Sequence, residues 1–229
     1  MKGSLVGKDI ELTAADGFKL GGYRADPASA PTAAVVVIQE IFGVNHHIRA
    51  VCDRFAALGY VAIAPAIFDR LERNFQSGYS PDEIAVARKF VANPDWDAML
   101  RDTQAAIDAV KDVGRVGIVG FCLGGSVAYA AATKLSGLSA AISYYGGAIV
   151  RFADDKPKVA TLLHFGEKDT GIPLSDVEIV RSKRTDVEIY VYPGAQHGFS
   201  CDERASYDKS SADLAWRRSL EFFGKHLRR

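Results

Sequence analysis

Runs of consecutive apolar residues alternate along the chain with segments whose apolar residues recur every three or four positions. Two clear runs are Ala33–Glu40 (AAVVVIQE) and Arg115–Gly120 (RVGIVG). Such runs are typical of strands buried on both faces of a parallel sheet. His47–Gly59 has apolar residues at helical spacing and ends in a glycine, which predicts a helix.

The same alternation continues to the C-terminal end. We expect further strands at 60–66, 139–147 and 159–169, a segment at 187–199 that begins as a strand, and helices at 80–93, 97–112, 123–134, 173–185 and 204–229. Asp16-Gly17 lies between two loosely alternating segments, which indicates a hairpin. The pattern predicts an α/β fold in three layers. Its central sheet is mostly parallel with helices on both faces, and an N-terminal antiparallel hairpin precedes it.

Length and composition narrow the class of protein. The 229 residues are 48% hydrophobic, which suits a single domain over 1–229. Lys plus Arg and Asp plus Glu are 28 each, so the zero net charge favours neither nucleic acid nor a membrane as a partner. Three cysteines without paired spacing do not form a disulfide framework. With no signal-peptide pattern and no apolar run of ~20 residues, we expect a cytoplasmic protein.

Three residues of catalytic type follow three of the expected strands. Cys122 follows the strand at 115–120, Asp169 ends the strand at 159–169, and the strand that begins the segment 187–199 leads into His197. The carboxyl ends of parallel strands share one edge of a sheet, where ligands gather. The order nucleophile, acid, histidine is that of α/β-hydrolases, which predicts a catalytic triad.

The segment GFCLGG explains how a cysteine could serve as the nucleophile. It matches G-x-[S/C]-x-G, in which Gly120 and Gly124 permit a tight turn between strand and helix. Cys122 then lies at a helix N-terminus, where an anion is stabilised. We expect His197 to accept the thiol proton and Asp169 to orient the imidazole. The backbone N–H of Leu123 would stabilise an oxyanion.

Four motifs resemble the dienelactone hydrolase (carboxymethylenebutenolidase) family: QEIFGVN at 39–45, GFCLGG at 120–125, GEKDTGIP at 166–173 and AQHGF at 195–199. The resemblance spans nearly the whole chain. It implies a single-domain α/β-hydrolase fold without a large cap. It also implies hydrolysis of lactones or activated enol esters by Cys, His and Asp through an acyl-thioester intermediate.

The same resemblance gives Glu40 a role. The matching glutamate in the family keeps the resting thiol protonated and accepts its proton when substrate arrives. A thiol gated in this way is protected from oxidation. The loop after this strand supplies an oxyanion donor in α/β-hydrolases, so we expect the backbone N–H of Ile41 to join that of Leu123.

Substrate-binding residues are less clearly marked. Known family members hold a substrate carboxylate with an arginine and a serine near the histidine, whereas this chain reads GFSCDER after His197. Arg70 and Arg73 are further arginine candidates, although arginines in such segments are more often solvated charges. The residues that we expect to bind substrate are Phe42, Phe199, Tyr144, Arg88 and Arg204.

The remaining histidines and cysteines favour structural roles. His46 and His47 have no suitably spaced third metal ligand, so we expect no metal and no cofactor. We expect His164 and Cys52 in the core and Cys201 in a loop, where it is exposed. The leading function is therefore a lactone or enol-ester hydrolase acting as a monomer or homodimer. The alternatives are a thioesterase or general carboxylesterase that uses the same site, or a non-catalytic small-molecule-binding protein.

Overall fold

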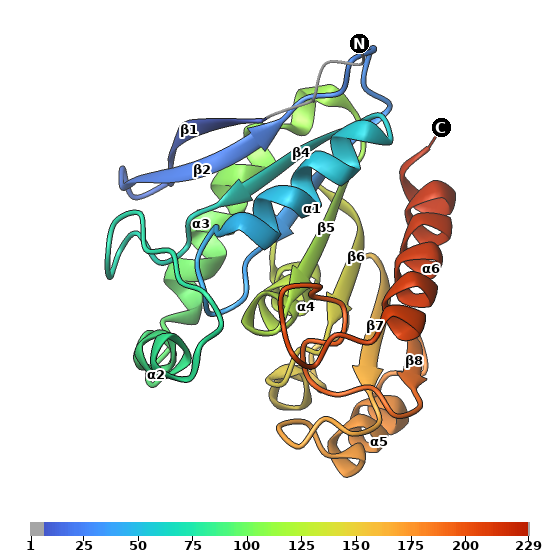
Figure 1. Ribbon diagram of the computed structural model, residues 1–229. Helices are drawn as coiled ribbons and strands as arrows, with labels where there is room; N and C mark the ends of the chain where they lie inside the picture. The colour runs from blue at the N-terminus through green and yellow to red at the C-terminus, as the bar shows by residue number, and fades with distance from the viewer. Residues whose placement is uncertain (1–6, 229) are drawn as a thin grey trace.

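Eight strands form one sheet in the order β1-β2-β4-β3-β5-β6-β7-β8 in the computed structural model, which describes residues 7–228 (Figure 1). The strands are β1 (Lys8–Thr13), β2 (Lys19–Ala25), β3 (Ala33–Ile38), β4 (Tyr60–Pro65), β5 (Val116–Phe121), β6 (Leu138–Tyr144), β7 (Ala160–Gly166) and β8 (Glu188–Tyr192). β1 and β2 form the expected antiparallel hairpin, and β2 is also antiparallel to β4. All other pairs are parallel, which confirms the predicted mostly parallel sheet.

Helices cover both faces of this sheet (Figure 1). They are α1 (His46–Ala57), α2 (Pro81–Lys89), α3 (Trp96–Asp108), α4 (Leu123–Lys134), α5 (Leu174–Lys183) and α6 (Lys209–Leu227). Alternate residues of β3 serve the two faces, because successive strand side chains point in opposite directions. Val35 and Val37 pack with α1 and α6, whereas Val36 and Ile38 pack with α3 and α4. The apolar run therefore lies between two cores, as its composition predicts.

The last helix begins five residues later than expected, because the chain first folds into turns. Backbone N–H groups of Cys201, Arg204 and Asp208 donate to the carbonyls of Gly198, Cys201 and Phe199 respectively. Asp208 then caps α6 by accepting from the N–H of Ser211 at 2.7 Å. These turns return the segment between β8 and α6 to the carboxyl edge of the sheet. Within residues 7–228, no helix is both long and apolar enough to span a membrane.

Candidate active site

A tight turn between β5 and α4 carries Cys122. A Cβ on Gly120 would lie 1.8 Å from the carbonyl oxygen of Gly124, and a Cβ on Gly124 would lie 2.4 Å from that of Ile38, so both positions require glycine. Cys122 itself has φ 55° and ψ −116°. A non-glycine residue in this conformation costs about 1–3 kcal/mol and is typical of functional sites. Its N–H donates to the carbonyl of Tyr144 at 3.0 Å, which fixes the turn.

The structure brings Cys122, His197 and Asp169 into one hydrogen-bonded chain. The Sγ atom of Cys122 lies 3.1 Å from Nε2 of His197, and Nδ1 of His197 lies 2.7 Å from Oδ2 of Asp169. Asp169 is buried, and its other oxygen accepts from the N–H of Gly171 at 2.9 Å. The two short contacts orient the imidazole between a sulphur and a carboxylate, which is the arrangement that proton transfer to histidine requires.

Neighbouring negative charges change the acidity of His197. Burial on its own lowers the pKa of this imidazole, but the charge of the Cys122 sulphur and the hydrogen bond to Asp169 more than offset it. The result is a pKa raised to about 10. The charge of the Cys122 sulphur is the largest of the causes that raise the pKa, followed by the hydrogen bond to Asp169. Both partners therefore increase the affinity of this imidazole for a proton.

A pocket of about 340 Å³ opens directly onto Cys122 and His197. Ile41 and Leu123 also line it. Among residues 7–228, no hydrogen bond uses the backbone N–H of either residue. Two unengaged N–H groups beside the sulphur are what an oxyanion would need, since donors near 3 Å stabilise developing charge.

Glu40 lies next to this pocket at the end of β3, and its carboxylate is paired with an arginine. One oxygen accepts a hydrogen bond from Arg204 at 3.0 Å, and Glu40 is 1% exposed. Burial on its own lowers the pKa of Arg204, but the charge of Glu40 together with those of Tyr145, Cys122 and Cys201 raises it overall. Among the described residues, no hydrogen bond joins Glu40 to Cys122, whose sulphur faces His197 instead.

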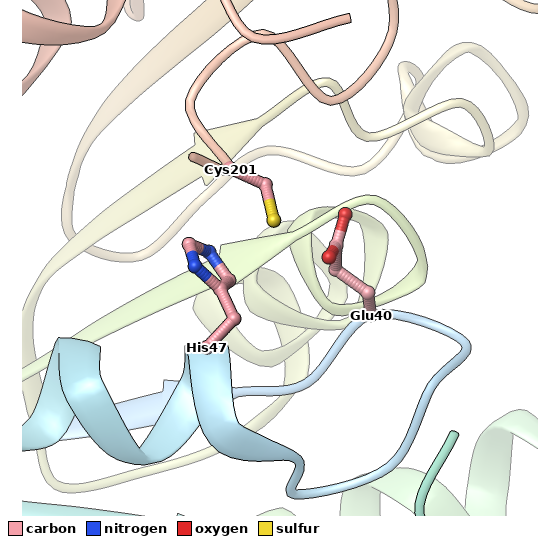
Figure 2. Close-up of side chains that lie close together, drawn as sticks. All are labelled: Glu40, His47 and Cys201. Carbon is pink, nitrogen blue, oxygen red and sulfur yellow. The ribbon is translucent and has the colours of Figure 1, made fainter. Parts of the chain in front are cut away.

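The carboxylate of Glu40 also lies close to His47 and Cys201 (Figure 2). One polar atom from each of these three side chains lies within 4.8 Å of the other two, and all three residues are buried. Burial and the charge of Glu40 raise the pKa of the Cys201 thiol to about 12. The expectation that Cys201 is exposed is wrong: it lies in a loop, but the turns before α6 fold it inward. The structure also supplies side chains of metal-ligand type near His47 that sequence spacing did not reveal.

None of the five expected substrate-binding residues lines the pocket, and Arg204 is paired with Glu40 instead. Phe42 and Phe199 are buried against other aromatic rings, and the hydroxyl of Tyr144 lies 2.7 Å from the Ser219 hydroxyl beneath α6. Arg88 is exposed on α2. Tyr145, not Tyr144, lies beside His197, with ring centroids 5.1 Å apart.

Two other expected core residues are where the sequence places them. His164 is buried in β7 with both ring nitrogens in hydrogen bonds, and Cys52 is buried on α1. These positions confirm their structural roles.

A mostly parallel sheet with a cysteine in the tight turn after β5, an aspartate after β7 and a histidine after β8 is typical of the α/β-hydrolase class. Within that class, the chain belongs to the dienelactone hydrolase family, whose model matches residues 20–227. The resemblance that the four motifs indicate is thus confirmed. By family and fold the chain is a carboxylic ester hydrolase.

Individual relatives agree over nearly the full length. A Synechocystis protein named "Putative carboxymethylenebutenolidase" is 38% identical and covers 92% of this chain and 94% of its own. An Escherichia coli protein of the same name is 34% identical, with coverages of 92% and 84%. The crystal structure of a "Putative Dienelactone Hydrolase" from Klebsiella pneumoniae superposes with a TM-score of 0.84 at 32% identity, covering 96% of this chain and 99% of that one.

Proposed function

We propose that this protein hydrolyses lactones or activated enol esters through an acyl-thioester on Cys122. The observation that supports this most directly is the contact chain from the Cys122 sulphur through His197 to Asp169 at the base of an open pocket. The identity and order of these residues are those of a nucleophile, a general base and the group that orients it.

In the first half of the reaction, the Cys122 thiol gives its proton to Nε2 of His197. The thiolate attacks the substrate carbonyl, and the oxyanion accepts hydrogen bonds from the N–H groups of Ile41 and Leu123. Collapse of this intermediate breaks the ester bond. His197 then protonates the departing oxygen, while Asp169 holds Nδ1–H throughout.

In the second half, His197 accepts a proton from water, and the resulting hydroxide attacks the thioester. The sulphur of Cys122 leaves as a thiolate and is neutralised by the imidazolium of His197. The product carboxylate and one proton are released, so atoms and charge balance. The side chains of this chain supply every acid and base in the scheme, which therefore invokes no cofactor.

Glu40 is proposed to control when the thiol ionises. In the observed arrangement it pairs with Arg204, and the sulphur contacts His197, which corresponds to the reactive state. In the resting state, Glu40 would move from Arg204 towards Cys122 and hold the thiol protonated. Its second oxygen has no hydrogen-bond partner among residues 7–228, so this movement breaks one buried ion pair and no other hydrogen bond of the carboxylate, and a hydrogen bond from the thiol would offset part of that cost.

Substrate preference follows from the leaving group and the pocket. An enol departs more easily than an alkoxide, so we expect enol esters to react faster than matched alkyl esters and amides not at all. A pocket of about 340 Å³ suits a small acyl group better than the long chain of a thioesterase substrate.

The deciding experiment compares an activated aryl ester with the wild type, Cys122→Ala and Cys122→Ser. Cys122→Ala should abolish turnover, and mass spectrometry of the acid-quenched wild type should show an acyl adduct on the peptide that contains Cys122. Full activity in Cys122→Ala, or an adduct elsewhere, would remove Cys122 from the mechanism.

The cellular setting is part of the same proposal. Cys52, Cys122 and Cys201 are all free thiols, which supports a reducing cytoplasm. We propose a small-molecule ester or lactone as the partner, with no nucleic acid or membrane involved, and a monomeric or homodimeric enzyme.

A further inference from the structure

Two of the four arginines that the sequence suggests as binding residues for a substrate anion form ion pairs with buried carboxylates. Arg204 donates to the buried Glu40, and Arg70 donates to the buried Asp102 at 2.7 Å. Removing either arginine from its partner would leave a buried carboxylate unpaired, which is costly. The two others, Arg73 and Arg88, are not among the residues that line the pocket at Cys122. None of these four arginines therefore offers an unpaired guanidinium to the pocket at Cys122.

Arg151 is an arginine that does line this pocket. It lies on the 3-10 helix Ile149–Phe152, between β6 and β7, and lines the pocket that contains Cys122 and His197. Within residues 7–228, its guanidinium forms no salt bridge and no hydrogen bond. Apart from His197, it is the one basic side chain among the described residues that line this pocket.

The segment that carries Arg151 is held in place from two sides. The N–H of Ala148 donates to Oγ of Ser126 on α4 at 2.9 Å, directly before the 3-10 helix. Phe152 packs edge-on against Trp96 with ring centroids 5.0 Å apart. The backbone of this cation is therefore fixed relative to the elbow, although its side chain is exposed and free to adapt.

The rest of the pocket wall is mainly apolar. Val91, Pro94, Trp96 and Ile172 line it, and no aspartate or glutamate does so among the described residues. An apolar wall with a single unpaired guanidinium is complementary to a molecule with an apolar body and one anionic end. A guanidinium matches the planar geometry of a carboxylate especially well.

We propose that Arg151 binds a carboxylate of the substrate, remote from the bond that is cleaved, and so makes the enzyme select anionic over neutral esters. This inference rests on the proposed function, because it assumes reaction at Cys122. It adds a specificity residue on the segment after β6, distant in sequence from the arginine that follows His197.

The test uses two pairs of esters, because the carboxylate could lie on either side of the scissile bond. For the acyl side, mono-p-nitrophenyl adipate is compared with p-nitrophenyl hexanoate. For the alcohol side, the butyrate ester of 3-hydroxybenzoate is compared with phenyl butyrate. The quantity measured is the ratio of kcat/KM for the anionic ester to that for the neutral one, in which any general damage to the enzyme cancels.

We expect Arg151→Gln to lower this ratio about 3- to 10-fold for one pair, mainly through KM, because a partly exposed ion pair contributes modestly. Arg151→Glu should lower it further, and added salt should lower it in the wild type but not in Arg151→Gln. Arg217→Gln, which alters an exposed arginine on α6, serves as the matched control and should leave the ratio unchanged.

Unchanged ratios in both Arg151 variants, for both pairs, would overturn the role of Arg151 while leaving the hydrolase proposal intact. Two other results would overturn the proposed function itself. One is that Cys122→Ala hydrolyses all four esters at the wild-type rate, and the other is that the wild type hydrolyses none of them.

Discussion

His164 lies in β7 and His197 lies in the loop after the neighbouring strand β8, but the pKa values of the two imidazoles are shifted in opposite directions. Tyr192 and Ser219 place hydroxyl oxygens 2.9 Å and 3.0 Å from the ring nitrogens of His164, and burial together with the charge of Arg218 lowers its pKa to about 3. His197 instead lies between a sulphur and a carboxylate, and its pKa is raised to about 10. Burial beside a positive charge therefore lowers the proton affinity of one imidazole, whereas negatively charged partners raise that of the other despite its burial.

Exposure separates the two histidines as well. His164 is fully buried below the strand ends, whereas the side chain of His197 is 30% exposed at the pocket. Substrate and water can therefore reach His197 and not His164. The comparison shows that a histidine in this fold becomes chemically useful through its charged neighbours and its position at the carboxyl edge of the sheet.

The largest effect expected from this comparison is on turnover. His197→Gln should lower kcat about 10⁴-fold, since loss of the base disables the nucleophile. His164→Gln should change kcat less than about 3-fold, because the ring touches no reacting group. Ester hydrolysis at pH 7.5 measures both, after circular dichroism has shown that each variant is folded. Similar losses in the two variants would mean that the comparison is wrong.

The next effect concerns the carboxylate that distinguishes the two sites. Asp169→Asn should lower kcat about 10³-fold, because an amide cannot stabilise the imidazolium and favours the wrong tautomer. It should also lower the pKa of His197, which NMR titration of the imidazole would follow. Asp176→Asn on α5 is a suitable control, since this aspartate lies outside the contact chain. Unchanged turnover in Asp169→Asn would exclude the proposed role of Asp169.

A third effect is on stability and depends on pH. The folded pKa of His164 lies below its unfolded value, so the unfolded chain binds a proton between about pH 6.5 and 3 while the folded chain does not. The neutral imidazole of His164 therefore contributes fully to the free energy of unfolding above pH 6.5, and this contribution is lost as the pH falls. Between pH 7 and pH 4.5 the wild type should lose about 2 kcal/mol more than His164→Gln.

Urea unfolding at the two pH values measures this difference. His46→Gln is the matched control, because that imidazole is exposed and its pKa is raised by Glu203. An equal loss of stability in the wild type and His164→Gln would show that His164 titrates normally in the folded protein.

The order of strands and helices along the sequence predicts one part of this site, and the irregular segments between them determine the rest. The strand ends that carry Cys122, Asp169 and His197 follow from apolar runs and glycines, because the fold forces parallel carboxyl ends together. The partner of Arg204 and the burial of Cys201 depend on turns between β8 and α6, which leave no periodic signal. Arg151 lies in an irregular segment, so no spacing rule relates it to Cys122, and the structure is needed to bring the two together.

The smallest effect tests how Glu40 influences the Cys122–His197 pair. Glu40→Gln removes a negative charge near the thiol and leaves Arg204 without its carboxylate partner, and both changes favour the thiolate. Iodoacetamide at pH 6.5 should therefore label Cys122 about 3- to 10-fold faster in this variant.

The buried Cys52 and Cys201 should stay unlabelled in both proteins, as peptide mapping would show. Glu203→Gln is the control, since this carboxylate pairs with the exposed His46 instead. Labelling of Cys122 at the wild-type rate in Glu40→Gln would mean that His197 and Asp169 alone set the ionisation of the thiol, and the gating role of Glu40 would have to be abandoned.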